Sequence, residues 1–198
     1  MIRLSFTAAA ALALAACQGE APTADAGNGD AAVANAVNAP GDATKAPQQF
    51  AFTGSDGAPL GSVTVTEDAA GLMLSVSATG LPAGRHGIHL HEKGLCEGPK
   101  FVSAGSHWNP NAKQHGRDNP AGAHLGDLVN LEVAADGSAK TGFPIPGAMI
   151  ASGSVMLGDA DGTALVIHAK ADDYKTEPSG DSGDRIACAV IAAPKPGL

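Results

Sequence analysis

The sequence predicts an all-β fold, a sandwich or barrel of about eight short antiparallel strands with two long functional loops. Short segments alternate between apolar and polar residues, and turn-forming residues separate them at regular spacing. After residue 48, no segment has the apolar period of a long amphipathic helix. The expected strands cover residues 50–53, 61–66, 72–78, 87–91, 128–133, 139–143, 164–168 and 186–191.

The segment 72–78 shows the alternation most clearly, because its odd and even positions differ in polarity. One face carries only apolar side chains, those of Leu72, Leu74, Val76 and Ala78. Hairpin-like turns are indicated by Asp136-Gly137 and Asp161-Gly162. Two stretches rich in Gly, Pro and Asn, residues 92–123 and 172–184, are too long for simple turns, and loops of such length are usually functional.

The first 17 residues have the pattern of an export signal. Arg3 precedes an apolar run over residues 4–16, which is shorter than the roughly 20 residues that a membrane-spanning helix needs. Small residues lead into Cys17, and this resembles the processing site of bacterial lipoproteins, in which the cysteine is lipidated. We expect an exported protein of the periplasm or cell envelope, anchored to a membrane through Cys17. The alternative is ordinary signal cleavage that leaves Cys17 without a role.

Residues 18–48 are expected to form a flexible linker, and residues 49–198 the folded domain. The linker consists mainly of Ala, Gly, Asn, Asp and Pro, and it cannot bury enough apolar surface to offset the entropy of ordering. Cys96 and Cys188 remain once Cys17 is assigned to the anchor. In an oxidising compartment these two are expected to form a disulfide, and two buried free thiols are the alternative.

A formal net charge of −8 argues against a nucleic-acid partner, because phosphates attract surfaces rich in Lys and Arg. It also argues against a polybasic mode of membrane binding, so the lipid anchor is the one expected membrane contact. A monomer and a homodimer are both compatible with the sequence, because strand faces that pair subunits look like ordinary strand faces.

The distribution of histidines favours a metal site. All seven lie between His86 and His168. On a strand, His89 and His91 share one face, while Ile88 and Leu90 occupy the other and pack into the core. His86 falls on the aliphatic side, so we expect an internal hydrogen-bonding residue rather than a metal ligand.

The loop after this strand supplies further candidate ligands, namely His107, His115, His124 and Asp127. Histidine nitrogens together with a carboxylate oxygen suit zinc in tetrahedral geometry. A site rich in imidazole with no free thiolate is compatible with copper.

These motifs together resemble copper/zinc superoxide dismutases, over roughly residues 50–192. The matching motifs are His86-Gly87-Ile88-His89-Leu90-His91, residues 103–110 (SAGSHWNP), His115-Gly116, His124-Leu125-Gly126-Asp127, residues 168–173 (HAKADD) and Arg185-Ile186-Ala187-Cys188. The resemblance implies a Greek-key β-barrel. It also implies an enzyme that disproportionates superoxide, its anionic substrate, to dioxygen and hydrogen peroxide.

The resemblance further implies the role of each site residue. Copper would be bound by His89, His91, His107 and His168, and zinc by His107, His115, His124 and Asp127. His107 would bridge the two metals as an imidazolate and act in catalysis. Asp172 would link a copper-binding and a zinc-binding histidine. The position of His86 on the aliphatic face of the strand, rather than the resemblance, places it outside the ligand set as a supporting residue. Cys96 and Cys188 would form the disulfide, and Arg185 would attract and position superoxide.

Two features leave alternatives open. Five acidic residues lie in the segment 172–184, and Asp184 precedes Arg185 where the family usually has a small or neutral residue. The field around the site must therefore be shaped locally to attract an anion. A metal-carrying protein without turnover is the second hypothesis, although it would need neither Asp172 nor Arg185. A zinc hydrolase fits less well, because no Glu is placed as a general base beside the histidine pair.

Overall fold

The computed structural model describes residues 45–196. This range contains nine β-strands, one 3-10 turn (Val102–Ala104) and no α-helix. The strands are β1 (Lys45–Gly54), β2 (Pro59–Asp68), β3 (Gly71–Ala78), β4 (Gly84–His86), β5 (Ile88–His91), β6 (Leu131–Val133), β7 (Ala139–Pro146), β8 (Thr163–His168) and β9 (Arg185–Ala192).

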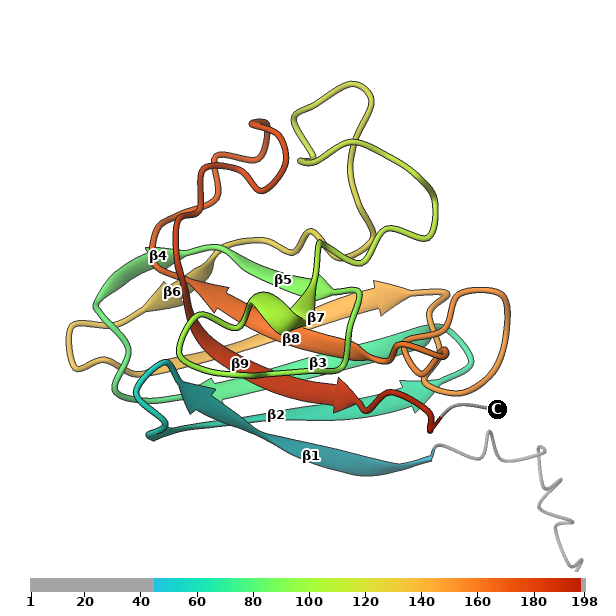
Figure 1. The fold of residues 1–198 in the computed structure, drawn as a ribbon, viewed down its shortest axis with the longest axis horizontal. Helices are drawn as coiled ribbons and strands as arrows, with labels where there is room; N and C mark the ends of the chain where they lie inside the picture. Colours follow the sequence, from blue (N-terminus) through green and yellow to red (C-terminus); the bar gives the residue numbers. More distant parts are fainter. Residues whose placement is uncertain (1–44, 197–198) are drawn as a thin grey trace, which may run out of the picture. The chain divides into compact units, whose positions relative to one another are not determined.

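Seven strands form one antiparallel sheet in the order β5-β8-β9-β1-β2-β3-β7, and β4 pairs with β6 in a separate ribbon. The sheet curls on itself, and two long loops project from the same side of it (Figure 1). The neighbours β5–β8, β9–β1 and β3–β7 are not consecutive in the chain, as in Greek-key connections. The predicted antiparallel all-β fold is therefore confirmed.

The main core lies between the inner faces of the curled sheet. In β3 the expected alternation holds, since Leu72, Leu74, Val76 and Ala78 are buried while the residues between them are exposed. Strand β8 is buried at every position. One face of β8 packs into the main core, and the other contacts a second apolar cluster formed by Phe101, Ala104, Ala164, Val166 and Cys188.

A disulfide joins the loop that follows β5 to strand β9. Cys96 and Cys188 are bonded, with their Cα atoms 5.7 Å apart, and Cys96 packs against the second apolar cluster. The predicted disulfide is confirmed, and the free-thiol alternative is excluded. The bond fixes the start of the long loop that leads away from β5.

Two expected strands are shorter in the structure. The strand predicted over residues 87–91 begins at Ile88 as β5, and Gly87 separates it from β4, which pairs with β6. Loop 169–184 lies against Gly87, whose backbone N–H donates to the carbonyl oxygen of Lys170 at 2.7 Å, and a Cβ at this position would lie 2.8 Å from Cβ of Ser182. The strand expected over residues 128–133 is limited to β6.

Strand β1 begins at Lys45, inside the predicted linker. Its residues 45–48 pair with β2, although the register shifts between Lys45 and Gln48, where Pro47 has no N–H to donate. The predictions for the signal peptide, for Cys17 and for most of the linker concern residues outside the described range. Within residues 45–196, no helix is long and apolar enough to cross a membrane.

Candidate metal centre

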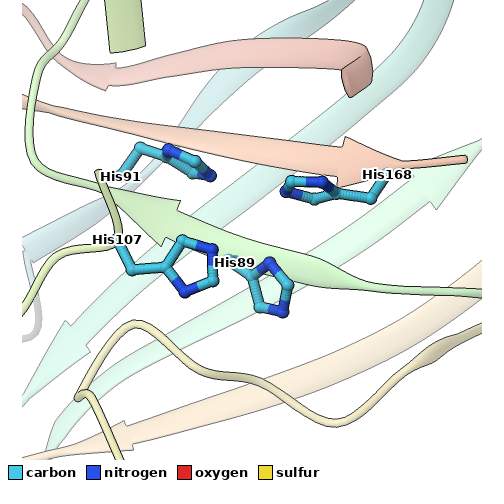
Figure 2. A group of neighbouring side chains, drawn as sticks. All are labelled: His89, His91, His107 and His168. Carbon is cyan, nitrogen blue, oxygen red and sulfur yellow. The ribbon is translucent and has the colours of Figure 1, made fainter. Parts of the chain in front are cut away.

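Four histidines from three parts of the chain meet beside the end of strand β5. We call His89, His91, His107 and His168 the four-histidine cluster. One ring nitrogen of each lies within 4.8 Å of those of the other three, and the four rings surround a common space (Figure 2). The first two lie on β5, the last ends the neighbouring β8, and His107 lies in the long loop.

Strand parity explains this placement. Ile88 and Leu90 point into the main core, so the alternate residues His89 and His91 point to the opposite face. The backbone of His107 forms a bridge to that of His91, which brings the loop histidine alongside the strand. The structure thus brings together the four residues predicted to bind copper.

Each histidine of this cluster has one engaged ring nitrogen and one buried nitrogen without a protein partner. The unpartnered atoms are His89 Nδ1, His91 Nε2, His107 Nε2 and His168 Nε2. A buried polar atom without a partner costs free energy, and four that converge on one space are the arrangement that a bound cation would satisfy. The donor set therefore fits a metal ion.

The opposite nitrogens fix the orientation of the rings. His91 Nδ1 lies 3.0 Å from the Gly105 carbonyl oxygen, and His168 Nδ1 lies 3.2 Å from that of Gly183. Each carbonyl oxygen accepts the ring proton, so the other nitrogen of the ring is left as a lone-pair donor.

A second group of donors adjoins the first. We call His107, His115, His124 and Asp127 the carboxylate cluster, in which one donor atom of each lies within 4.8 Å of the others. Oδ1 of Asp127 lies 2.8 Å from Nδ1 of His107, 3.1 Å from Nδ1 of His115 and 3.1 Å from Nδ1 of His124. Three imidazoles and one carboxylate match the usual ligands of zinc.

His107 belongs to both clusters. Its Nε2 atom has no partner and belongs to the four-histidine cluster, whereas its Nδ1 atom contacts Asp127. The ring therefore presents one nitrogen to each group of donors, which is the geometry that a bridging ligand requires.

A buried carboxylate connects the clusters by a second route. Asp172 Oδ2 lies 2.8 Å from His89 Nε2, and Asp172 Oδ1 lies 3.0 Å from His115 Nε2. His89 belongs to the four-histidine cluster and His115 to the carboxylate cluster. Asp172 therefore holds one ring of each cluster. This is the contact pattern predicted for Asp172.

His86 lies outside both clusters. Its Nδ1 atom is 2.8 Å from the carbonyl oxygen of His168, and its Nε2 atom is 2.9 Å from that of Pro82. The ring is buried and hydrogen-bonded to backbone, as the sequence predicted.

Burial determines the charge of the four-histidine cluster in the metal-free protein. Burial lowers the pKa of His107 to about 4 and that of His168 to about 3, and it lowers the pKa of His91 well below its usual value. These rings are neutral at pH 7, as metal binding requires.

Hydrogen bonding reverses the effect of burial in the carboxylate cluster. Burial alone would lower the pKa of His115, but its hydrogen bonds to Asp127 and Asp172 raise that pKa to about 9. Burial alone would raise the pKa of Asp127. Its hydrogen bonds with His107 and His115 outweigh this effect and hold the pKa far below its usual value.

A cavity of about 600 Å³ opens onto the clusters and reaches His107, His124, His168 and Arg185. Among residues 45–196, Arg185 is the only Lys or Arg that lines it. Its Nη1 and Nη2 atoms each donate a hydrogen bond at 2.6 Å, to the carbonyl oxygens of Phe101 and Gly105. Burial lowers the pKa of this guanidinium below its usual value.

The acidic residues near Arg185 differ in whether they line the metal cavity. Asp184 lines a different hollow of about 480 Å³, on another side of Arg185, and does not line the metal cavity. Asp173 accepts hydrogen bonds from the backbone of Lys175 and Thr176. Two carboxylates, Glu92 and Glu177, do line the cavity and oppose the charge of Arg185.

Several contacts of the site have no signal in the sequence. Glu177 accepts a hydrogen bond from the backbone N–H of His115 at 2.5 Å, across 62 residues of chain. Asn130 and Tyr174 contact Asp172 or its backbone. No spacing rule connects residues that are so far apart and lie in irregular loops.

The fold and the site together define a curled antiparallel β-sheet protein with two adjoining groups of candidate metal ligands, and His107 belongs to both groups. The family model for copper/zinc superoxide dismutase (SODC) matches residues 60–191. The chain therefore belongs to the copper/zinc superoxide dismutase family.

Relatives and solved structures agree with this membership. The chain is 45% identical over 139 residues to the superoxide dismutase-like protein YojM of Bacillus subtilis, covering 69% of this chain and 71% of that protein. It is also 45% identical over 139 residues to a superoxide dismutase [Cu-Zn] of Caulobacter vibrioides, covering 69% and 80%. A crystal structure of a SOD-like protein from Bacillus subtilis has a TM-score of 0.70 at 40% identity, covering 75% of this chain and 99% of that one.

The metal-free protein is expected to lose stability as the pH falls from 6.5 to 4. Unfolded histidines take up protons near pH 6.5, whereas His107 and His168 in the folded state do so near 4 and 3. The unfolded chain then binds more protons in this window, so the free energy of unfolding should fall by a few kcal/mol. Urea denaturation of the metal-free protein at several pH values measures this change in the free energy of unfolding.

The variant His168→Gln is the matched test, because it removes one of the lowered pKa values and should give a shallower slope. The raised pKa of His115 adds stability that is fully present below pH 6.5 and is lost only as the pH rises toward 9, so it does not affect the slope in this window. A free energy of unfolding that is constant or rises between pH 6.5 and 4 would contradict the assignment of neutral buried rings.

Proposed function

We propose that the protein catalyses the disproportionation of superoxide. Two superoxide ions and two protons give one dioxygen and one hydrogen peroxide. The observation that carries this proposal is the ring of His107, which faces a different group of metal donors with each of its two nitrogens. Membership of the copper/zinc superoxide dismutase family supports the same conclusion.

The donor atoms support one metal for each cluster. The four-histidine cluster (His89, His91, His107 and His168) offers nitrogen atoms only, which suits copper, and the carboxylate cluster adds an oxygen to three nitrogens, which suits zinc. When bound by His89, His91, His107 and His168, copper would supply the one-electron oxidation and reduction of superoxide. Zinc has no redox chemistry, and when bound by the carboxylate cluster it would hold His107 and the loop.

Arg185 and His107 have separate roles in this reaction. Arg185 is held by two backbone carbonyl oxygens, so its positive charge stays at the wall of the cavity, where it attracts and orients the small anion. The side chain of His107 lines the same cavity, and its ring can hold a proton for delivery to the peroxide product.

The two other hypotheses fit the site less well. A metal carrier without turnover has no use for a fixed guanidinium at the cavity wall or for a carboxylate that links the clusters. A zinc hydrolase needs an open position on the metal, but the carboxylate cluster already offers four protein donors. The one glutamate hydrogen-bonded to that cluster, Glu177, accepts the backbone N–H of His115.

The test of the proposed function is superoxide consumption by the purified protein loaded with copper and zinc, followed by stopped flow. The wild type should be active. His107→Ala removes the shared ring and should lower activity by more than about 100-fold. Arg185→Ala removes no member of either cluster and should lower the second-order rate constant by about tenfold, because local steering is lost.

Arg85→Ala is the matched control, since Arg85 is an exposed arginine paired with Glu132 on the β4–β6 ribbon. It should leave the rate within about twofold of wild type. Higher salt should slow the wild type more than Arg185→Ala. An inactive wild type that retains both metals would contradict the proposed function and favour the metal carrier.

We also propose that the protein is exported to the periplasm or cell envelope and anchored to a membrane through Cys17. The apolar run that ends at Cys17 supports export, and so does the Cys96–Cys188 disulfide, since such bonds persist in oxidising compartments. A lipid on Cys17, followed by a linker rich in Ala and Gly, would tether the domain beside the membrane.

Labelling with radioactive palmitate tests this anchor in cells that express the full chain. The wild type should be labelled and should remain in the membrane fraction, whereas Cys17→Ser should take up no label. Equal labelling of both proteins would contradict the assignment of Cys17 as the lipidated residue.

A further inference from the structure

Tyr174 is the only tyrosine of the chain, and it joins three segments of the site. It lies in the loop between β8 and β9, two residues after Asp172. The segment Gly116–Asp118 of the other long loop contacts it on one side, and Asn130, just before β6, contacts it on another. None of the roles described above requires a tyrosine at this position.

Every polar group of Tyr174 has a partner. Its backbone N–H donates to Oδ1 of Asp172 at 2.6 Å, and its carbonyl oxygen accepts from the backbone N–H of Asp118 at 3.0 Å. Its hydroxyl oxygen accepts the backbone N–H of Asn130 at 2.8 Å. The guanidinium of Arg117 lies 3.9 Å from the centre of the ring, a cation–π contact.

The backbone of Tyr174 is held in an unfavourable conformation. Its φ angle is +64°, in the left-handed region that residues with a side chain rarely adopt. Such a conformation persists only where the surrounding contacts impose it. Gly116 packs directly against this backbone, because a Cβ on that glycine would lie 2.0 Å from the carbonyl oxygen of Tyr174.

Asn130 fixes the backbone of Asp172 from the other side. Its Nδ2 atom donates to the carbonyl oxygen of Asp172 at 2.9 Å, and its Oδ1 atom accepts the N–H of Asp172 at 2.8 Å. Asn130 is buried, so these two bonds are shielded from water. Tyr174 in turn holds the backbone of Asn130 through its hydroxyl.

We propose that Tyr174, supported by Arg117 and Asn130, is a positioning residue that holds the carboxylate of Asp172 between His89 and His115. It acts on both clusters through this carboxylate, and it fixes the zinc-binding loop to the loop between β8 and β9. The affinity of the carboxylate cluster for zinc depends on this contact. The inference rests on the proposed metal content of the site and not on turnover.

Geometry favours this role over general packing of the loop. A packing residue would need only the apolar ring, whereas here the hydroxyl satisfies a buried backbone N–H and the amide contacts the bridging carboxylate itself. Tyr174→Phe therefore separates the two roles, because it keeps the ring, the cation–π contact and the backbone but leaves the Asn130 N–H without an acceptor.

The experiment measures zinc affinity of the full chain by competition with a chromophoric chelator. It compares wild type with Tyr174→Phe, Tyr174→Leu and Arg117→Ala. Because supporting residues around metal ligands typically contribute 10- to 100-fold in affinity, Tyr174→Leu should weaken zinc binding by about 10- to 100-fold. The other two variants should weaken it by about threefold to tenfold, and the control Arg85→Ala by less than about twofold.

Two spectra separate positioning from a loss of stability. Cobalt bound in place of zinc should show shifted visible absorption bands in Tyr174→Leu, and the paramagnetic resonance spectrum of copper should change, because Asp172 also contacts His89. If Tyr174→Leu fails to fold, Tyr174→Phe and Arg117→Ala decide the outcome. Zinc affinities within twofold of wild type and unchanged spectra in the folded variants would overturn the inference.

The result is independent of the proposed activity. If the wild type binds both metals but consumes no superoxide, and the variants still weaken zinc binding in the expected order, the positioning role stands while the proposed function falls. If the wild type is active and the variants bind zinc as wild type does, the proposed function stands and the role of Tyr174 is overturned.

Discussion

The ring of His107 is the constraint on which the rest of the site depends. A buried imidazole must satisfy two nitrogens, and here neither can be satisfied by water because the residue is only 6% exposed. One nitrogen faces three other histidines, and the other faces Asp127. Without cations, the site holds several buried nitrogens with no partner, which is unfavourable. Bound metal ions would turn that cost into coordination, so metal binding and the stability of this region are coupled.

The backbone around Gly105 connects metal binding to the handling of the anion. The carbonyl oxygen of Gly105 accepts hydrogen bonds from His91 Nδ1 and from Arg185 Nη2, so one peptide group orients a cluster histidine and the guanidinium together. The Cys96–Cys188 disulfide anchors the same loop to β9, the strand that begins at Arg185. This arrangement lets a protein of net charge −8 present a fixed positive charge where a small anion must enter.

The sequence predicts the parts of the site that regular structure determines, and it misses those that loops determine. Strand parity places His89 and His91 together, because side chains alternate along β5. His86 lies on β4, and backbone carbonyl oxygens hold it outside both clusters. The sequence does not predict that Gly87 separates β4 from β5, or that Ser182 of the loop 169–184 lies against this glycine. The acceptors for His91, His168 and Arg185 are backbone carbonyl oxygens, and such groups leave no trace in residue identity. For the same reason the role of Tyr174 follows from geometry and not from spacing.

The most direct test of the two-metal site is a crystal structure of the metal-loaded protein with anomalous scattering data collected at the copper and zinc absorption edges. We expect one copper peak enclosed by His89, His91, His107 and His168, one zinc peak enclosed by His107, His115, His124 and Asp127, and the ring of His107 between them. A single metal position, or two positions that share no histidine, would contradict this expectation.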